Sequence, residues 1–188
     1  MQDVNIDLIG KWCGTLMKWV TRRHVHVDRI ASPWLIKKFI DPEAEFNFVP
    51  WPGTELKPED GIPIDIPGVE LGHYNNKCTF ETIIEKYNLL DKDPVLADMA
   101  KIIHGADVAA DMANIPEAAG LEVISGGMIW ISKDDQEALE KGFLLYDALY
   151  ANLKVRRLRK KHQSQIKKMS RNEALAFLRK HLKNQSNG

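Results

Sequence analysis

Histidine and carboxylate side chains gather between Gly72 and Asp107, and such side chains bind divalent metals or transfer protons in proteins. Four of them are candidate metal ligands: His73, Glu81, His104 and Asp107. Imidazole and carboxylate ligands together suit iron, manganese or zinc. We therefore predict that these four residues hold one divalent metal ion.

Each of these residues also has an ordinary structural explanation. His104 and Asp107 are three residues apart, so they share a helix face or a helix end, where a histidine interacts favourably with the helix dipole. Glu81 falls in the first turn of a helix capped by Thr79, where carboxylates are common. His73 follows a strand and would then be a half-buried surface histidine. The metal site exists only if the fold brings these elements together.

A second cluster of charged residues lies in Thr21–Arg29 and leads into the start of a predicted helix, which favours anion binding. We interpret Arg22, Asp28 and Arg29 as a site for a small oxyanion, or as residues that support the metal ligands. Asp28 would be a fifth metal ligand or would form an ion pair with an arginine. In an extended strand, His24 and His26 share a face with Asp28 and form either a metal-binding pair or an exposed pair.

Cys78 precedes the predicted helix that contains Glu81. A helix N-terminus lowers the pKa of a thiol, so Cys78 would serve as a ligand or a redox thiol. We group it with Arg22, Asp28 and Arg29 as a residue that binds an anion or supports the metal ligands. The alternative is that Cys78 is buried as a small apolar residue. With Cys13 as the second cysteine, the chain has no disulfide framework. The sequence contains no P-loop, no Gly-x-Gly-x-x-Gly and no Cys-x-x-Cys, so these motifs give no support to nucleotide-binding or zinc-finger functions.

The elements that must position these residues alternate between strand and helix patterns. Strands are predicted near residues 18–27, 44–49 and 62–74, and amphipathic helices dominate the second half of the chain. The clearest helix runs from Asp134 to Lys154 and buries one apolar side that includes Leu144. The predicted fold is α+β, with a small sheet in the N-terminal half covered by five or more helices.

The chain has 188 residues, 44% of them hydrophobic, which suits one domain with extensions. We predict an N-terminal arm over residues 1–17, a domain over 18–153 and a basic helical tail over 154–188.

The tail holds twelve Lys and Arg residues and one acid, a net charge of +11, so the rest of the chain carries −11. Such a tail could bind nucleic acid through Lys154–Lys183, although Phe177 is its only aromatic residue of the kind that stacks on bases. The alternatives are a solvated helical extension or an arm that forms a homo-oligomer.

No apolar run approaches the length that spans a bilayer, and the acidic N-terminus does not read as an export signal. We expect a cytoplasmic protein that has no membrane partner.

A series of short motifs in a fixed order resembles the C-terminal domain of ChrB-type chromate resistance proteins. The resemblance covers about Trp19 to Asn152. Its motifs include Val27-Asp28-Arg29-Ile30-Ala31, Gly72-His73, Cys78-Thr79-Phe80-Glu81, His104-Gly105-Ala106-Asp107 and Tyr146-Asp147-Ala148-Leu149-Tyr150. The resemblance implies a link to chromate resistance, with chromate as a candidate oxyanion. Long members of the family are described as chromate-responsive regulators of a chromate efflux operon, and their separate N-terminal domain has no counterpart in residues 1–17.

Two hypotheses follow from the residues and the resemblance. In the first, the chain is a chromate-resistance-type domain that binds a divalent metal, a small oxyanion or both. In the second, it is a fragment of a chromate-responsive transcriptional regulator whose basic tail binds DNA.

Overall fold

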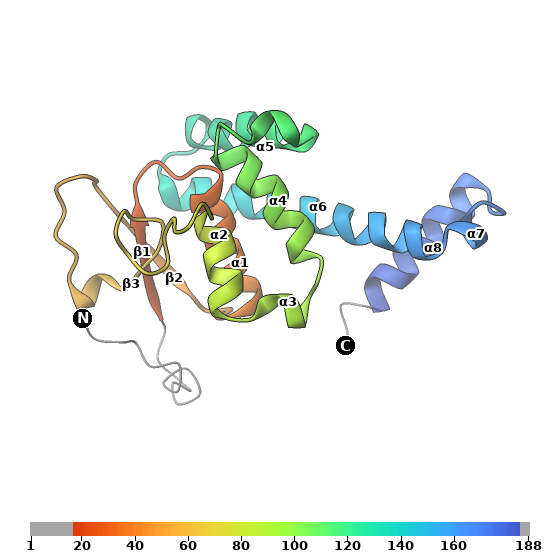
Figure 1. Cartoon of the computed structure of the whole chain (residues 1–188), viewed down its shortest axis with the longest axis horizontal. Coiled ribbons are helices and arrows are strands. Elements are labelled where there is room, and N and C mark those ends of the chain that lie inside the picture. The colour runs from red at the N-terminus through yellow and green to blue at the C-terminus, as the bar shows by residue number, and fades with distance from the viewer. Residues whose placement is uncertain (1–16, 185–188) are drawn as a thin grey trace.

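A small parallel sheet lies at one end of the molecule, and helices cover it and extend away from it (Figure 1). The computed structural model describes residues 17–184. The strands are β1 (Lys18–Arg22), β2 (Glu45–Val49) and β3 (Ile62–Pro63), in the order β2-β1-β3, and both pairings are parallel. The α+β fold, with its sheet in the N-terminal half and a helix-rich C-terminal half, is confirmed.

Eight α-helices occupy much of the described chain. They are α1 (Asp28–Phe39), α2 (Thr79–Lys86), α3 (Leu89–Lys92), α4 (Leu96–Asp107), α5 (Pro116–Gly127), α6 (Asp135–Lys161), α7 (Gln163–Ile166) and α8 (Arg171–Asn184). Three short 3₁₀ helices accompany them: η2 (Pro58–Asp60), η3 (Met112–Asn114) and η4 (Met128–Ile131). No helix between residues 17 and 184 combines the length and apolar character that a bilayer crossing needs.

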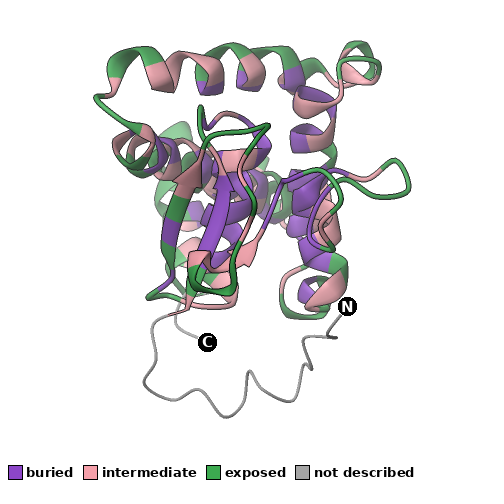
Figure 2. Ribbon diagram, turned by 90° about the vertical axis from the view of Figure 1, so that its left-hand side faces the viewer, coloured by how far each residue is buried: buried purple, intermediate pink, exposed green. Residues whose placement is uncertain are grey.

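The core forms where β1 and the apolar face of α1 meet the later helices (Figure 2). As the central strand, β1 buries Trp19 and Val20 completely. Trp34 of α1 packs its ring against the rings of Tyr146 and Tyr150 of α6, and the Tyr146 hydroxyl donates a hydrogen bond to the carbonyl of Val27. These contacts anchor α1, whose first residues, Asp28 and Arg29, belong to the candidate site.

Three details differ from the expectations. The first strand ends at Arg22, because the chain turns through positive φ values at His24 (63°) and Val27 (31°), so His24 and His26 do not share a strand face with Asp28. The strand expected over 62–74 shrinks to β3 and two isolated bridges, since prolines and turns interrupt it. Leu144, expected on the buried side of α6, is 75% exposed.

Close contact between α1 and α6 depends on Gly142. A Cβ atom there would lie 2.4 Å from Cγ2 of the buried Ile30. We expect Gly142→Ala to lower the free energy of unfolding by about 1–3 kcal/mol, because α1 and α6 must separate to accept the methyl group. Gly120→Ala in α5 is the matched control: its Cβ meets nothing within 4 Å, so it should stabilise the protein by about 0.5–1 kcal/mol. Urea denaturation measures the free energy of unfolding of both variants, and equal changes in the two would contradict the packing argument.

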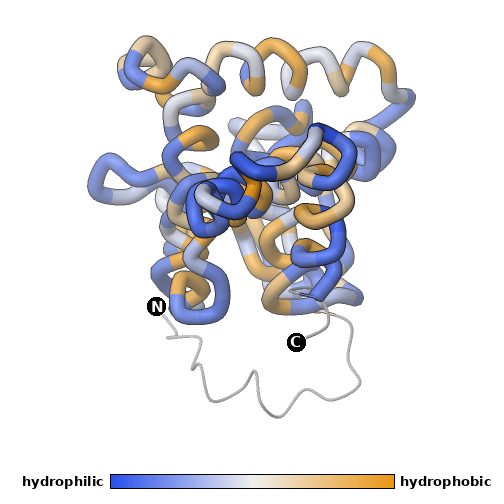
Figure 3. The backbone as a smooth tube through the Cα atoms, turned by 90° about the vertical axis from the view of Figure 1, so that its right-hand side faces the viewer, coloured by the Kyte–Doolittle hydropathy of each residue, from blue (hydrophilic) through white to orange (hydrophobic). Residues whose placement is uncertain are grey.

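The second half of α6, together with α7 and α8, forms an arm that projects from the body (Figure 1). Figure 3 views the molecule from the side on which this arm lies. The predicted helical tail is thus made of helices separated by short turns, and the last helix ends at Asn184. Lys154, Arg156 and Arg157 form ion pairs with Asp93, Glu117 and Asp98 of the body. The predicted N-terminal arm lies, apart from Met17, outside the described residues, as does Cys13.

Candidate metal centre

Asp28 ties the start of α1 to the start of α2. Its carboxylate is 1% exposed and accepts hydrogen bonds from the backbone N–H groups of Thr79 (2.6 Å) and Phe80 (3.0 Å) and from the hydroxyl of Ser32 (2.8 Å). The first N–H groups of a helix have no partner within the helix, and its dipole favours a negative charge there. This explains why a buried acid is tolerated here. Burial raises the pKa of Asp28, although its contact with His73 opposes that shift.

His73 brings three carboxylates from separate elements around one nitrogen atom. It lies in the loop before α2, and its side chain is 47% exposed. The oxygens around its Nε2 atom are Asp107 Oδ2 at 3.1 Å, Asp65 Oδ1 at 3.4 Å and Asp28 Oδ2 at 3.6 Å. Bonds of about 2.1 Å to a shared metal ion place neighbouring ligand atoms about 3.0–3.4 Å apart. His73, Asp28 and Asp107 each offer a ligand atom within 4.8 Å of the other two, which is compact enough to hold a metal ion.

The electrostatics around His73 favour a positive charge. The carboxylates of Asp107, Asp28 and Asp65 raise the pKa of His73 to about 12, against the opposing effect of burial. In the metal-free protein, the proton on His73 therefore supplies the positive charge that the three acids require. A divalent cation would satisfy the same requirement.

Asp65 was not among the predicted site residues. It is buried in the loop after β3, where its backbone φ is 48°. Its carboxylate contacts Arg22 (3.1 Å), Arg29 (3.5 Å) and the hydroxyl of Thr79 (3.3 Å), and its carbonyl accepts a hydrogen bond from Arg22 Nε (2.7 Å). Burial alone would raise the pKa of Asp65, but contact with His73 and the charges of both arginines hold it below its usual range. The feature of the sequence that could have indicated Asp65 is its position as an acid between two apolar residues in a proline-rich loop.

Arg22 and Arg29 therefore lie beside the His73 group, but they pair with Asp65 and not with Asp28. The ion pair considered for Asp28 is replaced by its hydrogen bonds to the start of α2. This leaves one lone pair of Asp28 Oδ2 available to a cation, because a carboxylate oxygen accepts two bonds.

Glu81 and His104 form a separate group with Cys78. His104 Nδ1 lies 2.6 Å from Glu81 Oε2, and Nε2 lies 3.1 Å from Asp111 Oδ2. Burial opposes a proton on His104, but the two carboxylates outweigh it and raise the pKa. The same Glu81 oxygen accepts the backbone N–H of Cys78, whose side chain is buried, and burial raises the pKa of its thiol.

The four predicted ligands thus fall into two pairs. His73 meets Asp107, and Glu81 meets His104. The sequence predicted one shared site and did not distinguish these pairs, because the pairing depends on how α2 packs against α4.

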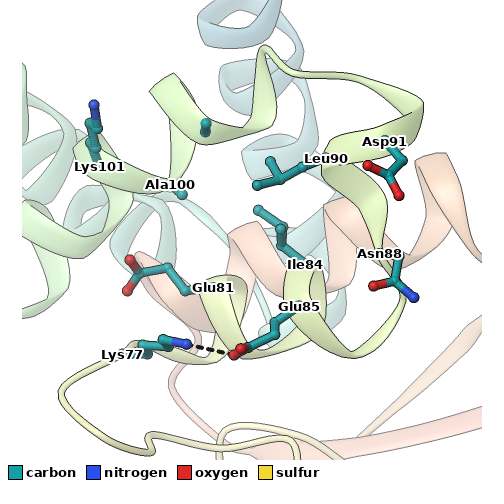
Figure 4. A pocket seen from close by; sticks show the side chains of 10 residues that line it. Lys77, Glu81, Ile84, Glu85, Asn88, Leu90, Asp91, Ala100 and Lys101 are labelled. Carbon is teal, nitrogen blue, oxygen red and sulfur yellow. Dashed lines mark hydrogen bonds and ion pairs between the residues drawn. The ribbon is translucent and has the colours of Figure 1, made fainter.

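Two pockets adjoin the Glu81–His104 pair. One, of about 510 Å³, lies between α2 and α4 and is bordered by Glu81, the Lys77–Glu85 ion pair, Ile84 and Leu90 (Figure 4). The other, of about 310 Å³, is lined by Glu81, Lys101, His104, Asp111, Asn114 and Ile115. The His104 side chain is therefore reachable from solvent.

Comparison with known proteins gives a consistent result. Residues 19–153 match the family described as ChrB, C-terminal domain. The chain is 35% identical over 136 residues to Protein ChrB of Cupriavidus metallidurans, which covers 72% of this chain. The matched region is 40% of that relative's length. No solved structure matches the chain significantly.

The family match covers well over half of the chain and includes both groups of candidate ligands. The relative's identity and coverage agree with it. The chain therefore belongs to the ChrB C-terminal domain family.

Proposed function

We propose that this domain binds a divalent metal ion through His73, Asp28 and Asp107. The observation that carries the proposal is the set of carboxylate oxygens 3.1–3.6 Å from Nε2 of His73, contributed by elements far apart in the chain. Asp65 lies beside the three ligands, and its ion pairs with Arg22 and Arg29 hold its carboxylate in that position. Three protein ligands leave coordination positions open for water or a small anion.

The charge balance favours a cation over a directly bound oxyanion. Arg22 and Arg29 already face the carboxylate of Asp65, and Asp28 and Asp107 would repel an anion. A small oxyanion such as chromate would then bind as a ligand of the metal, near the arginines. Two carboxylates and one imidazole suit manganese, iron or zinc.

The proposal predicts that His73→Gln and Asp107→Asn each weaken metal binding by at least about 100-fold, because each removes one of three ligands. Elemental analysis after dialysis against Mn²⁺, Fe²⁺ or Zn²⁺ measures the metal retained. Asp91→Asn, an exposed acid, and His162→Gln, on the arm, are matched controls that should retain it. Equal metal content in His73→Gln and wild type, with both proteins folded, would contradict the proposal.

The nucleic-acid partner considered for Lys154–Lys183 stays a prediction. Within residues 17–184, the cations of the arm beyond Leu158 have no carboxylate partner: Arg159, Lys160, Lys161, Lys167, Lys168, Arg171, Arg179, Lys180 and Lys183. This free positive charge is what such a partner would use.

A further inference from the structure

We propose that Cys78, Glu81 and His104 form a second metal site, separate from the His73 site and selective for zinc. Their ligand atoms, one from each side chain, all lie within 4.8 Å of one another. The site shares no ligand with the His73 group, so metal binding can be lost at one site and kept at the other.

The local structure of α2 places two of the three ligands. Cys78 is the residue before the first turn of α2, and Glu81 is the third residue of the helix, so both side chains turn toward the helix N-terminus. The Glu81 carboxylate is held there by the backbone N–H of Cys78 at 3.0 Å. The positive end of the helix favours a thiolate once a metal ion replaces the thiol proton, which leaves to solvent.

His104 lies in the last turn of α4, and each of its two ring nitrogens already faces a carboxylate. Nδ1 faces Glu81 and Nε2 faces Asp111 at 3.1 Å. With a metal ion on Nδ1, the Nε2–H group donates to Asp111, which is the carboxylate–histidine–metal arrangement common in zinc proteins. Nδ1 and Glu81 Oε2 lie 2.6 Å apart, closer than two atoms that share a metal ion, so these two side chains separate slightly when the metal binds.

The pocket of about 310 Å³ gives a route to this site, because Glu81, His104 and Asp111 all line it. One thiolate, one imidazole and one carboxylate form a softer ligand set than the oxygen-rich His73 group. The domain would therefore hold two different metals, zinc at Cys78 and a harder cation at His73.

Titration of the 188-residue chain with Co²⁺, a spectroscopic substitute for zinc, tests the inference. Cobalt bound to Cys78 should produce a near-ultraviolet thiolate-to-metal charge-transfer absorption. Cys78→Ser should abolish this absorption, while Cys13→Ser, the matched cysteine control, and His73→Gln should retain it. Asp111→Ala should weaken Co²⁺ binding by about 10–100-fold, because it removes the partner of Nε2.

Glu81→Gln keeps an acceptor for the Cys78 N–H and so tests a ligand while preserving the helix start. It should weaken Co²⁺ binding by at least about tenfold with the charge-transfer absorption still present at saturation. The inference is overturned if folded wild-type protein shows no such absorption, if Cys78→Ser retains it, or if Cys13→Ser loses it. Failure of the His73 proposal would leave these outcomes unchanged.

Discussion

Raising the pH from 6 to 9 should strengthen Mn²⁺ binding at the His73 site by about tenfold per pH unit. The three carboxylates raise the pKa of His73 to about 12, so its imidazole is protonated throughout this range when no metal is bound. Each Mn²⁺ that binds must displace that proton, and displacing one proton changes affinity tenfold per pH unit.

The stability of the metal-free protein should change with pH in the opposite direction to the metal affinity. Because the pKa of His73 is raised on folding from 6.5, the protonated imidazole stabilises the metal-free fold fully below pH 6.5, and this contribution declines as the pH rises toward 12. His73 is 47% exposed, so added salt should weaken its attraction to the carboxylates and reduce this contribution to stability.

Electron paramagnetic resonance of free Mn²⁺ gives the affinity at each pH. His73→Gln should lower the slope by about one proton, and His162→Gln should leave it unchanged. A wild-type affinity that does not change between pH 6 and 9 would contradict the role of His73.

Asp28→Ala should lower the free energy of unfolding by about 3–5 kcal/mol. The change leaves the N–H groups of Thr79 and Phe80 and the hydroxyl of Ser32 without their acceptor in a buried site. Loss of one partner from a buried charged network typically costs this much.

Asp28→Asn separates the hydrogen bonds from the charge. It keeps one acceptor oxygen and removes the repulsion from Asp65 and Asp107, so we expect a loss of only about 1–2 kcal/mol. Asp91→Ala, at an exposed position, should stay within about 0.5 kcal/mol of wild type. Urea denaturation of the metal-free protein at pH 7 measures all three, and equal losses for Asp28→Ala and Asp91→Ala would contradict the account.

Local patterns in the sequence predicted several elements closely. The alternation in Glu45–Val49 matches β2. The helix expected to begin at Asp134 is α6, and Asp134 caps it by accepting a hydrogen bond from the N–H of Glu137. The helical positions of Glu81 and His104 were also predicted correctly, because periodicity is a local property. The cap expected at Thr79 was wrong: Cys78 is the N-cap of α2, and Thr79 is its first residue.

The pairing of site residues depends on tertiary packing, which local patterns do not encode. Asp65 joins the site because the chain turns with a positive φ there and bridges Ile64 to Leu71. Likewise, the turn at His24 and Val27 converts the expected strand face into a helix start that carries Asp28. A positive φ is a clear outlier for the β-branched Val27 and is uncommon even for His24 and Asp65, whose types adopt it more often than most, so sequence preference alone did not indicate these turns.

Anomalous diffraction from crystals of the full chain grown with Mn²⁺ tests the central claim most directly. We predict one manganese peak bonded to His73 Nε2, Asp28 Oδ2 and Asp107 Oδ2, at about 2.0–2.3 Å from each. That peak should be absent in His73→Gln crystals grown in the same way. A folded wild-type protein with no manganese between these three side chains would contradict the claim.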